Sequence, residues 1–122
     1  MSILNRNLMA FSKRIKAEMI KDCPRVYFRE AAEKKIFPYV VYDIRVLSEI
    51  RVIFELDIWG IRDGELNLQK LADDLEEHLD GSIISDPLFM ASIYTNNDLK
   101  WVTDEDKDIR HINMSFTCTY QG

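Results

Sequence analysis

The acidic run at Asp104, Asp106 and Asp108 has a spacing close to that of a known metal site. Carboxylates at these alternate positions are the first, third and fifth ligands of a calcium-binding loop. That loop also requires glycine at its sixth position and a bidentate glutamate at its twelfth, where this chain has Ile109 and Ser115. The run leads into a strand-like sequence instead of a helix. We therefore expect a solvated loop that can meet a partner, with no bound calcium.

A second pair of carboxylates, Glu55 and Asp57, is spaced by two within a strand-like segment. Residues two apart in a strand project from the same face, and paired carboxylates can perform acid–base chemistry. Ile53 and Trp59 share that face, and the sequence places no histidine or nucleophile beside the pair. We expect a partly exposed sheet face on which the two carboxylates pair with basic residues of a neighbouring strand or subunit.

Other motifs of catalysis and metal binding are missing from the sequence. His78 and His111 have no cysteine or carboxylate at a ligand spacing, no glycine-rich phosphate loop is present, and no serine stands in a nucleophile elbow. Cys118 falls on an apolar strand face and Cys23 precedes a proline, and two cysteines do not form a disulfide framework. The sequence predicts no catalytic residue, cofactor or metal, and therefore no enzyme.

Two tryptophans are candidates for binding. Trp59 and Trp101 each close a strand-like segment before a turn, so they are either end-caps of the core or anchors of an interface, where tryptophan is enriched. The second sheet face, with Tyr42, Ile53 and Trp59 among charges, is half apolar, as is typical of a face that packs against another copy or a partner. The candidate interface residues are Trp59, Arg62, Trp101, Asp104, Asp106 and Asp108.

Length, composition and charge restrict the class of protein. The 122 residues suffice for a single domain, 1–122, and 47% hydrophobic and 30% charged residues are typical of a soluble globular domain. The net charge of -5 argues against nucleic acid as a primary ligand, and the basic residues near the N-terminus are expected to form a solvated helix face. No apolar stretch is long enough for a membrane helix, and no signal sequence is recognisable, so we expect neither membrane association nor export.

Hydrophobic periodicity predicts the order helix, strand, strand, strand, helix, strand, strand. Apolar residues recur every three or four positions in residues 3–20 and 68–79. Strand-like segments are residues 26–30, 39–46, 51–59, 88–94 with a continuation at 99–102, and 109–120. Asp63 or Asn67 is expected to cap the second helix and Gly81 to end it. The predicted class is α+β, a mostly antiparallel or mixed sheet of about four or five strands with two main helices on one face.

Four segments stand in a distinctive order within residues 24–120: FPYVVY at 37–42, ELDIWG at 55–60, LADDLE at 71–76 and DEDKDIR at 104–110. Together with the alternating strand that follows them, they make the chain resemble the tail-terminator proteins of long-tailed bacteriophages and prophages. This family is also described as tail-completion or head-to-tail joining proteins. Its pattern carries no catalytic motif.

The resemblance implies a structural role. Members of the family are small α+β subunits that assemble into a six-membered ring, which caps the tail tube, stops its polymerisation and offers a surface to the head-side connector. The implied partners are copies of the same chain, the tail-tube protein and the connector, while DNA only passes through the lumen. A negative lumen lets DNA slide without sticking, which agrees with the acidic charge.

The implied location is the tail or neck of the virion, after assembly in the cytoplasm of the bacterial host. Two alternatives remain open from the sequence. The chain is compatible with another neck or tail-tube component, which also forms rings. It is also compatible with a small prophage-encoded binding module that acts on a host protein.

Overall fold

The computed structural model describes residues 3–87 and 89–121, and the side chains of residues 8–87 and 89–120. Its strands are β1 (Val26–Phe28), β2 (Tyr39–Val46), β3 (Arg51–Ile61), β4 (Ile83–Asp86), β5 (Phe89–Thr95), β6 (Lys100–Val102) and β7 (Ile109–Gln121). They form one seven-stranded sheet in the order β1-β2-β3-β7-β5-β4, with β6 paired to β7 off this path. The β1–β2 pair is parallel and the other pairs are antiparallel.

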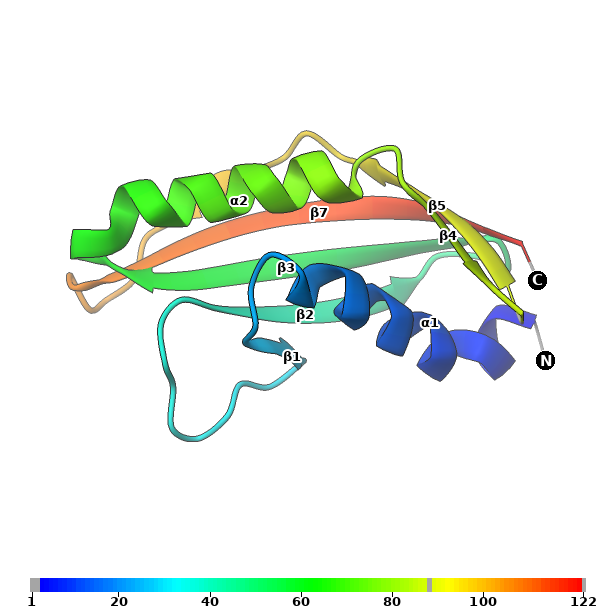
Figure 1. Cartoon of the computed structure of the whole chain (residues 1–122), viewed down its shortest axis with the longest axis horizontal. Helices are drawn as coiled ribbons and strands as arrows, with labels where there is room; N and C mark the ends of the chain where they lie inside the picture. Colours follow the sequence, from blue (N-terminus) through cyan, green and yellow to red (C-terminus); the bar gives the residue numbers. More distant parts are fainter. Residues whose placement is uncertain (1–2, 88, 122) are drawn as a thin grey trace.

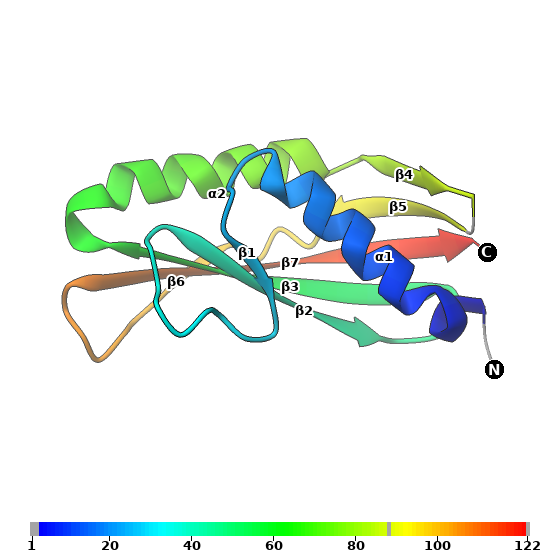
Figure 2. The same cartoon turned by 60° about the horizontal axis from the view of Figure 1, so that its bottom comes forward.

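Two helices cover one face of this sheet. They are α1 (Ile3–Ile20) and α2 (Glu65–Leu79), and a short 3₁₀ helix (Arg62–Gly64) leads into α2. Figures 1 and 2 show α2 running along the long strands β3 and β7 while α1 crosses the sheet closer to β2. The predicted α+β class, with both helices on one face, is confirmed. None of the described helices is long and apolar enough to cross a bilayer.

The sheet contains more strands than the predicted four or five. β4 is short and lies just before Pro87, so it has too little alternation to stand out in the sequence. β6 does not continue β5: β6 pairs with β7 near His111, whereas β5 pairs with the C-terminal half of β7. Asn97, at φ 54°, lies in the turn that separates the two strands. Leu88, the first residue of the predicted fourth strand, lies outside the described residues.

The core lies between the helices and the alternating residues of the long strands. In the β3–β7 register, Phe54 faces Phe116 and Leu56 faces Met114, and the two phenylalanine rings stack with centroids 4.8 Å apart. Cys118 on the same face of β7 is fully buried, as predicted, and burial raises the pKa of its thiol. The helices complete this core with Phe11, Ile15, Met19, Leu68, Ala72, Leu75 and Leu79.

The two ends of α2 differ in how well they were predicted. The N-cap residue is Gly64, which makes no side-chain capping bond. Asp63 lies in the preceding 3₁₀ helix and Asn67 lies inside α2, so both predicted caps are wrong because the chain enters the helix through an extra turn. Gly81 has φ +79°, a conformation that glycine adopts without a Cβ penalty, and its predicted role after the helix is confirmed.

Tyr42 lies on the opposite face from the one predicted. It pairs with Leu56 in the β2–β3 register and is 2% exposed on the helix side of the sheet. Its hydroxyl donates to the Ser12 carbonyl at 3.1 Å and lies 3.0 Å from the Ser12 hydroxyl, and burial raises its pKa. The residues of β2 that face away from the helices are Tyr39, Val41, Asp43 and Arg45.

Candidate interaction surface

We call the sheet face turned away from α1 and α2 the outer face. The odd-numbered residues of β2, β3 and β7 form it, and in β3 each of these is half-buried or exposed while each intervening residue is buried. Glu55, Asp57, Ile53 and Trp59 share this face, as the period of two predicted. The outer face therefore carries charges, aromatic rings and aliphatic side chains side by side.

An aromatic stack crosses three strands near the end of this face. The Trp59 ring of β3 stacks on the His111 ring of β7 with centroids 3.7 Å apart and planes inclined by 14°. On its other side Trp59 meets Tyr39 of β2 at 6.3 Å and 18°, and Phe37 in the loop before β2 lies 5.4 Å from Tyr39. Register explains the row, because Tyr39 pairs with Trp59 and Trp59 pairs with His111.

Asp57 is joined to this stack. Its Oδ1 lies 2.6 Å from His111 Nε2 and accepts a hydrogen bond from Asn113 Nδ2 at 2.9 Å. The expectation that no histidine lies near this carboxylate is wrong, because the antiparallel register brings His111 beside it. The expectation that Asp57 pairs with a basic residue of a neighbouring strand is confirmed. Glu55 lies opposite Ser115 and makes no ion pair with the side chains that are described.

The loop of residues 29–38 and this end of the outer face enclose an open groove of about 950 Å³, which we call the aromatic groove. Phe37, Tyr39 and Trp59 supply its rings. Burial and the nearby charge of Asp104 raise the pKa of Tyr39. The four carboxylates and two cations of its lining, which leave it net negative, are Glu30, Glu33, Asp57, Asp104, Arg29 and Lys35.

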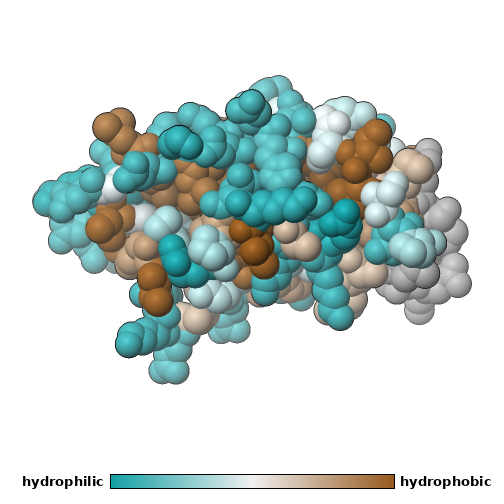
Figure 3. Space-filling view, in the orientation of Figure 1, coloured by the Kyte–Doolittle hydropathy of each residue, from teal (hydrophilic) through white to brown (hydrophobic). Residues whose placement is uncertain are grey.

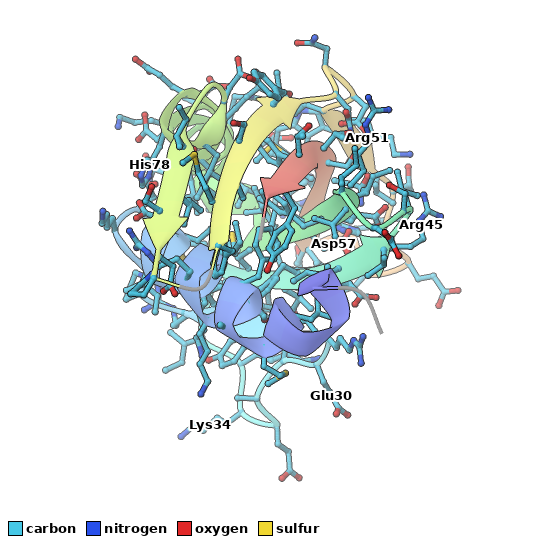
Figure 4. All side chains as sticks on the ribbon, turned by 90° about the vertical axis from the view of Figure 1, so that its right-hand side faces the viewer. Glu30, Lys34, Arg45, Arg51, Asp57 and His78 are labelled. Atoms are coloured by element: carbon cyan, nitrogen blue, oxygen red, sulfur yellow. The ribbon has the colours of Figure 1, made fainter. Side chains whose placement is uncertain are left out.

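The loop that borders the aromatic groove projects from the body of the protein. Figure 1 shows it hanging below the strands, and the corresponding part of Figure 3 is mostly hydrophilic. In Figure 4, Glu30 and Lys34 of this loop point outward from the protein. The groove is thus bordered by a charged loop on one side and by the aromatic row on the other.

Three of the predicted interface residues meet in a second groove. Arg62, Trp101 and Asp104 line an open groove of about 460 Å³ beside Arg110 and Lys107. Asp104 lines both this groove and the aromatic groove. The predicted set is therefore brought to one end of the molecule, although it is divided between the two faces of the sheet.

The tryptophans lie on opposite sides of the sheet. Trp101 pairs with Ile112 on the helix side, is 41% exposed, and donates from Nε1 to the Gln69 side chain of α2 at 3.2 Å. Trp59 is half-buried on the outer face. Neither is among the buried residues of the core. Neither closes its strand, since β3 continues to Ile61 and β6 to Val102.

The acidic loop is organised by its own side chains. The Asp106 amide donates to Asp104 Oδ1 at 2.8 Å, and the Asp108 amide donates to Asp106 Oδ1 at 2.9 Å. Asp108 also meets Arg62, with Nη2 and Oδ1 3.5 Å apart. Within the described part of the chain, histidine, cysteine and acidic side chains form no group of three suited to a metal ion. The carboxylates act here as caps of loop backbone groups.

Sequence analysis did not predict a polar contact that joins α2 to α1 and to the turn after it. His78 of α2 lies with Nδ1 2.7 Å from Asp22 Oδ2 and Nε2 3.0 Å from Glu18 Oε2. The bond to Asp22 raises the pKa of His78 although burial opposes it, and Glu18 adds to the rise. Burial acts to raise the pKa of Glu18, but its bonds to Lys21 and His78 hold it below the ordinary value. These partners are about 60 positions apart in the sequence, so no local spacing pattern could predict the contact.

The fold has counterparts among solved structures. No protein-family model matches the sequence, and no curated protein matches it significantly. One solved chain, which carries no functional description, aligns over 93% of this chain and 92% of its own length with a TM-score of 0.65 and 13% identity. A chain in the virion of a native gene transfer agent particle aligns over 91% of this chain and 97% of its own length, with a TM-score of 0.60 and 12% identity. At these identities the likeness concerns the fold.

Proposed function

We propose that this chain is a structural subunit of a phage-type virion, and within it a tail terminator. It would form a ring on the end of the tail tube and join the tube to the head-side connector. The observation that carries the proposal is the fold shared over 91% of the chain with a chain of a gene transfer agent virion. The ordered segments that resemble the tail-terminator family support the finer assignment.

The surface chemistry supports assembly over catalysis. The outer face combines the half-buried rings of Trp59 and His111 and the buried ring of Tyr39 with exposed charges, a mixture typical of surfaces that meet another protein. The aromatic groove is open to solvent, whereas a site for a small substrate buries most of the ligand's surface. In this proposal the chain is not an enzyme, needs no cofactor, and acts in the tail or neck of the virion with copies of itself, the tube protein and the connector as partners.

Tail-tube capping tests this proposal. The tail-tube protein of the same particle is allowed to polymerise with and without the purified chain, and tube lengths and ends are recorded by negative-stain electron microscopy. We expect shorter tubes, each with additional ring-shaped density at one end. Tubes of unchanged length with bare ends would overturn the assignment.

Two other outcomes identify the alternatives. Incorporation along the whole tube, or binding to the head-side connector alone, would indicate another tube or neck component. Failure to bind either, together with capture of one host protein at equal stoichiometry, would indicate a prophage-encoded binding module.

A further inference from the structure

Residues 45–51, which comprise the end of β2, the connecting turn and the first residue of β3, form an exposed apolar tip that we call the hairpin tip. Val46, Leu47 and Ile50 are 39%, 50% and 55% exposed. The turn is nevertheless held in place, because the Leu47 amide donates to the Arg51 carbonyl at 3.0 Å and the Tyr120 amide donates to the Ile50 carbonyl at 2.7 Å. Three aliphatic side chains are thus presented to solvent by an ordered turn, which lowers the entropic cost of burying them.

Two arginines flank these aliphatic side chains. Arg45 and Arg51 stand at the two ends of the turn, and neither forms an ion pair with the side chains described here. Figure 4 shows both on the side of the sheet away from α1. With Glu49 as the only acid between residues 45 and 51, the hairpin tip is net positive.

The aromatic groove lies at the other end of the same two strands and has the complementary chemistry. Tyr39 pairs with Trp59 at the groove end, and Val46 pairs with Val52 at the tip end. Seven residue steps in a strand span about 23 Å. The groove offers rings and a net negative lining, whereas the tip offers aliphatic side chains and arginines. Because the two surfaces lie so far apart, one molecule cannot bring its own tip into its own groove.

We propose that the hairpin tip of one copy docks in the aromatic groove of a second copy. The aliphatic side chains would bury against Phe37 and Trp59, which are half-buried in the lining of the groove. The flanking arginines would lie near Asp104, where a charge-assisted hydrogen bond is favoured. Such a contact joins two different surfaces of identical subunits. Repetition of a heterologous contact gives a closed ring when the rotation closes and an open filament when it does not.

This inference deepens the proposed function, because ring closure rests on the tail-terminator assignment while the contact itself does not. A mixing experiment tests the contact directly. Leu47→Asp with Ile50→Asp removes the tip, and Trp59→Ala with Asp104→Lys removes the groove. Each variant alone retains only one of the two complementary surfaces, so neither should self-associate. An equimolar mixture retains one complete contact.

Sedimentation velocity of the mixture should show a heterodimer of twice the 14.4 kDa chain mass that does not grow further with concentration. A mixture that stays monomeric overturns the proposal, whether or not the native chain assembles. Self-association of either variant alone to the native level also overturns it. Leu66→Asp, on an 88% exposed residue of α2 away from both surfaces, is the matched control and should leave association unchanged.

A milder double variant tests the same contact with less risk that the protein misfolds. Arg45→Glu with Arg51→Glu keeps the aliphatic tip and reverses its charge, and should weaken association by about tenfold or more. Far-UV circular dichroism establishes that each variant is folded before mixing. The outcomes separate the two proposals: a heterodimer with no capping of tail tubes supports the contact and contradicts the tail-terminator function. Capped tubes without a heterodimer would support the tail-terminator function and contradict the proposed contact.

Discussion

The two faces of β3 have the same backbone and opposite roles. On the helix side, Phe54 and Leu56 are fully buried among apolar neighbours. On the outer face, Glu55 and Asp57 alternate with Ile53 and stand partly in water. One face is complete within the single chain, whereas the other leaves rings and aliphatic groups half covered. Folding alone buries the helix side of β3, whereas the outer face stays accessible for contact with another protein.

The polar contacts follow the same division. Around the buried face, the described polar side chains are few, and the Tyr42 hydroxyl is satisfied by Ser12. The outer face instead carries bonds that join strands, such as Asp57 with His111. Hydrogen bonds of this kind fix the positions of side chains on the outer face and leave that face accessible to a partner. Changes on the two faces should therefore affect different measurements.

The largest effect is expected on the helix side. Phe116→Ala removes a fully buried ring that stacks on Phe54, which should lower the free energy of unfolding by about 3–5 kcal/mol. Urea titration followed by circular dichroism measures it. Thr119→Val, on the outer face of the same strand, should change stability by about 0.5 kcal/mol or less. Equal losses in the two variants would contradict the division between the faces.

On the outer face, Trp59→Ala should have a smaller effect on folding than on association. The variant loses the stacks with His111 and Tyr39, and aromatic pairs contribute about 0.5–1.5 kcal/mol each. Thermal unfolding measures that loss. Sedimentation of the same samples should show self-association weakened beyond what this loss of stability explains. If the folded Trp59→Ala variant self-associates as strongly as the native chain, Trp59 does not contribute to the proposed contact.

A pH-dependent effect is expected at the contact between the helices. Because the pKa of His78 is raised above 6.5 in the folded state, its contribution is complete below pH 6.5 and is lost as pH rises through the folded value. Glu18, whose pKa is lowered from 4.5, contributes above pH 4.5 and loses its contribution as pH falls. Both contributions are therefore complete between pH 4.5 and 6.5.

Thermal unfolding of the native chain and of His78→Gln across this range measures the effect. The variant should be less stable by about 1 kcal/mol at pH 6, and the difference should shrink toward pH 8. Glu77→Gln on the same helix is the control. A difference between native and His78→Gln that is constant with pH would show that the charge of His78 does not act here.

The smallest effect concerns the loop of residues 103–108. We expect its amides to be more protected from exchange after assembly than in the free subunit, because Asp104 lies at the edge of both grooves. Hydrogen exchange of the chain, alone and on tail tubes, measures the protection. Equal protection in the two states would exclude this loop from the contact.

Much of the fold follows from periodicity in the sequence. The alternation in residues 109–120 predicted β7 and its buried face, and β2 has the predicted bounds. The face of Tyr42 was not predictable from its own segment, because four adjacent apolar residues, 39–42, show no alternation and only pairing with β3 decides the phase. β4 and β6 contain four and three residues, too few for a pattern.

The candidate surface was predictable only in part. Alternation placed Asp57 and Trp59 on one face, but the approach of His111 depends on strand register between segments 54 positions apart. The link from His78 to Asp22 likewise depends on how α1 and α2 pack. The spacing of residues within one segment does not predict such long-range contacts. A charged or aromatic residue therefore reveals its partner only once the strands and helices are in place.

Light scattering of the native particle over a concentration series, alone and with tail-tube protein, tests the central claim most directly. We expect the chain to assemble into a ring with several times the monomer mass, either by itself or on the end of the tube. A particle that keeps the 14.4 kDa mass of one chain at every concentration and ignores the tube would contradict it.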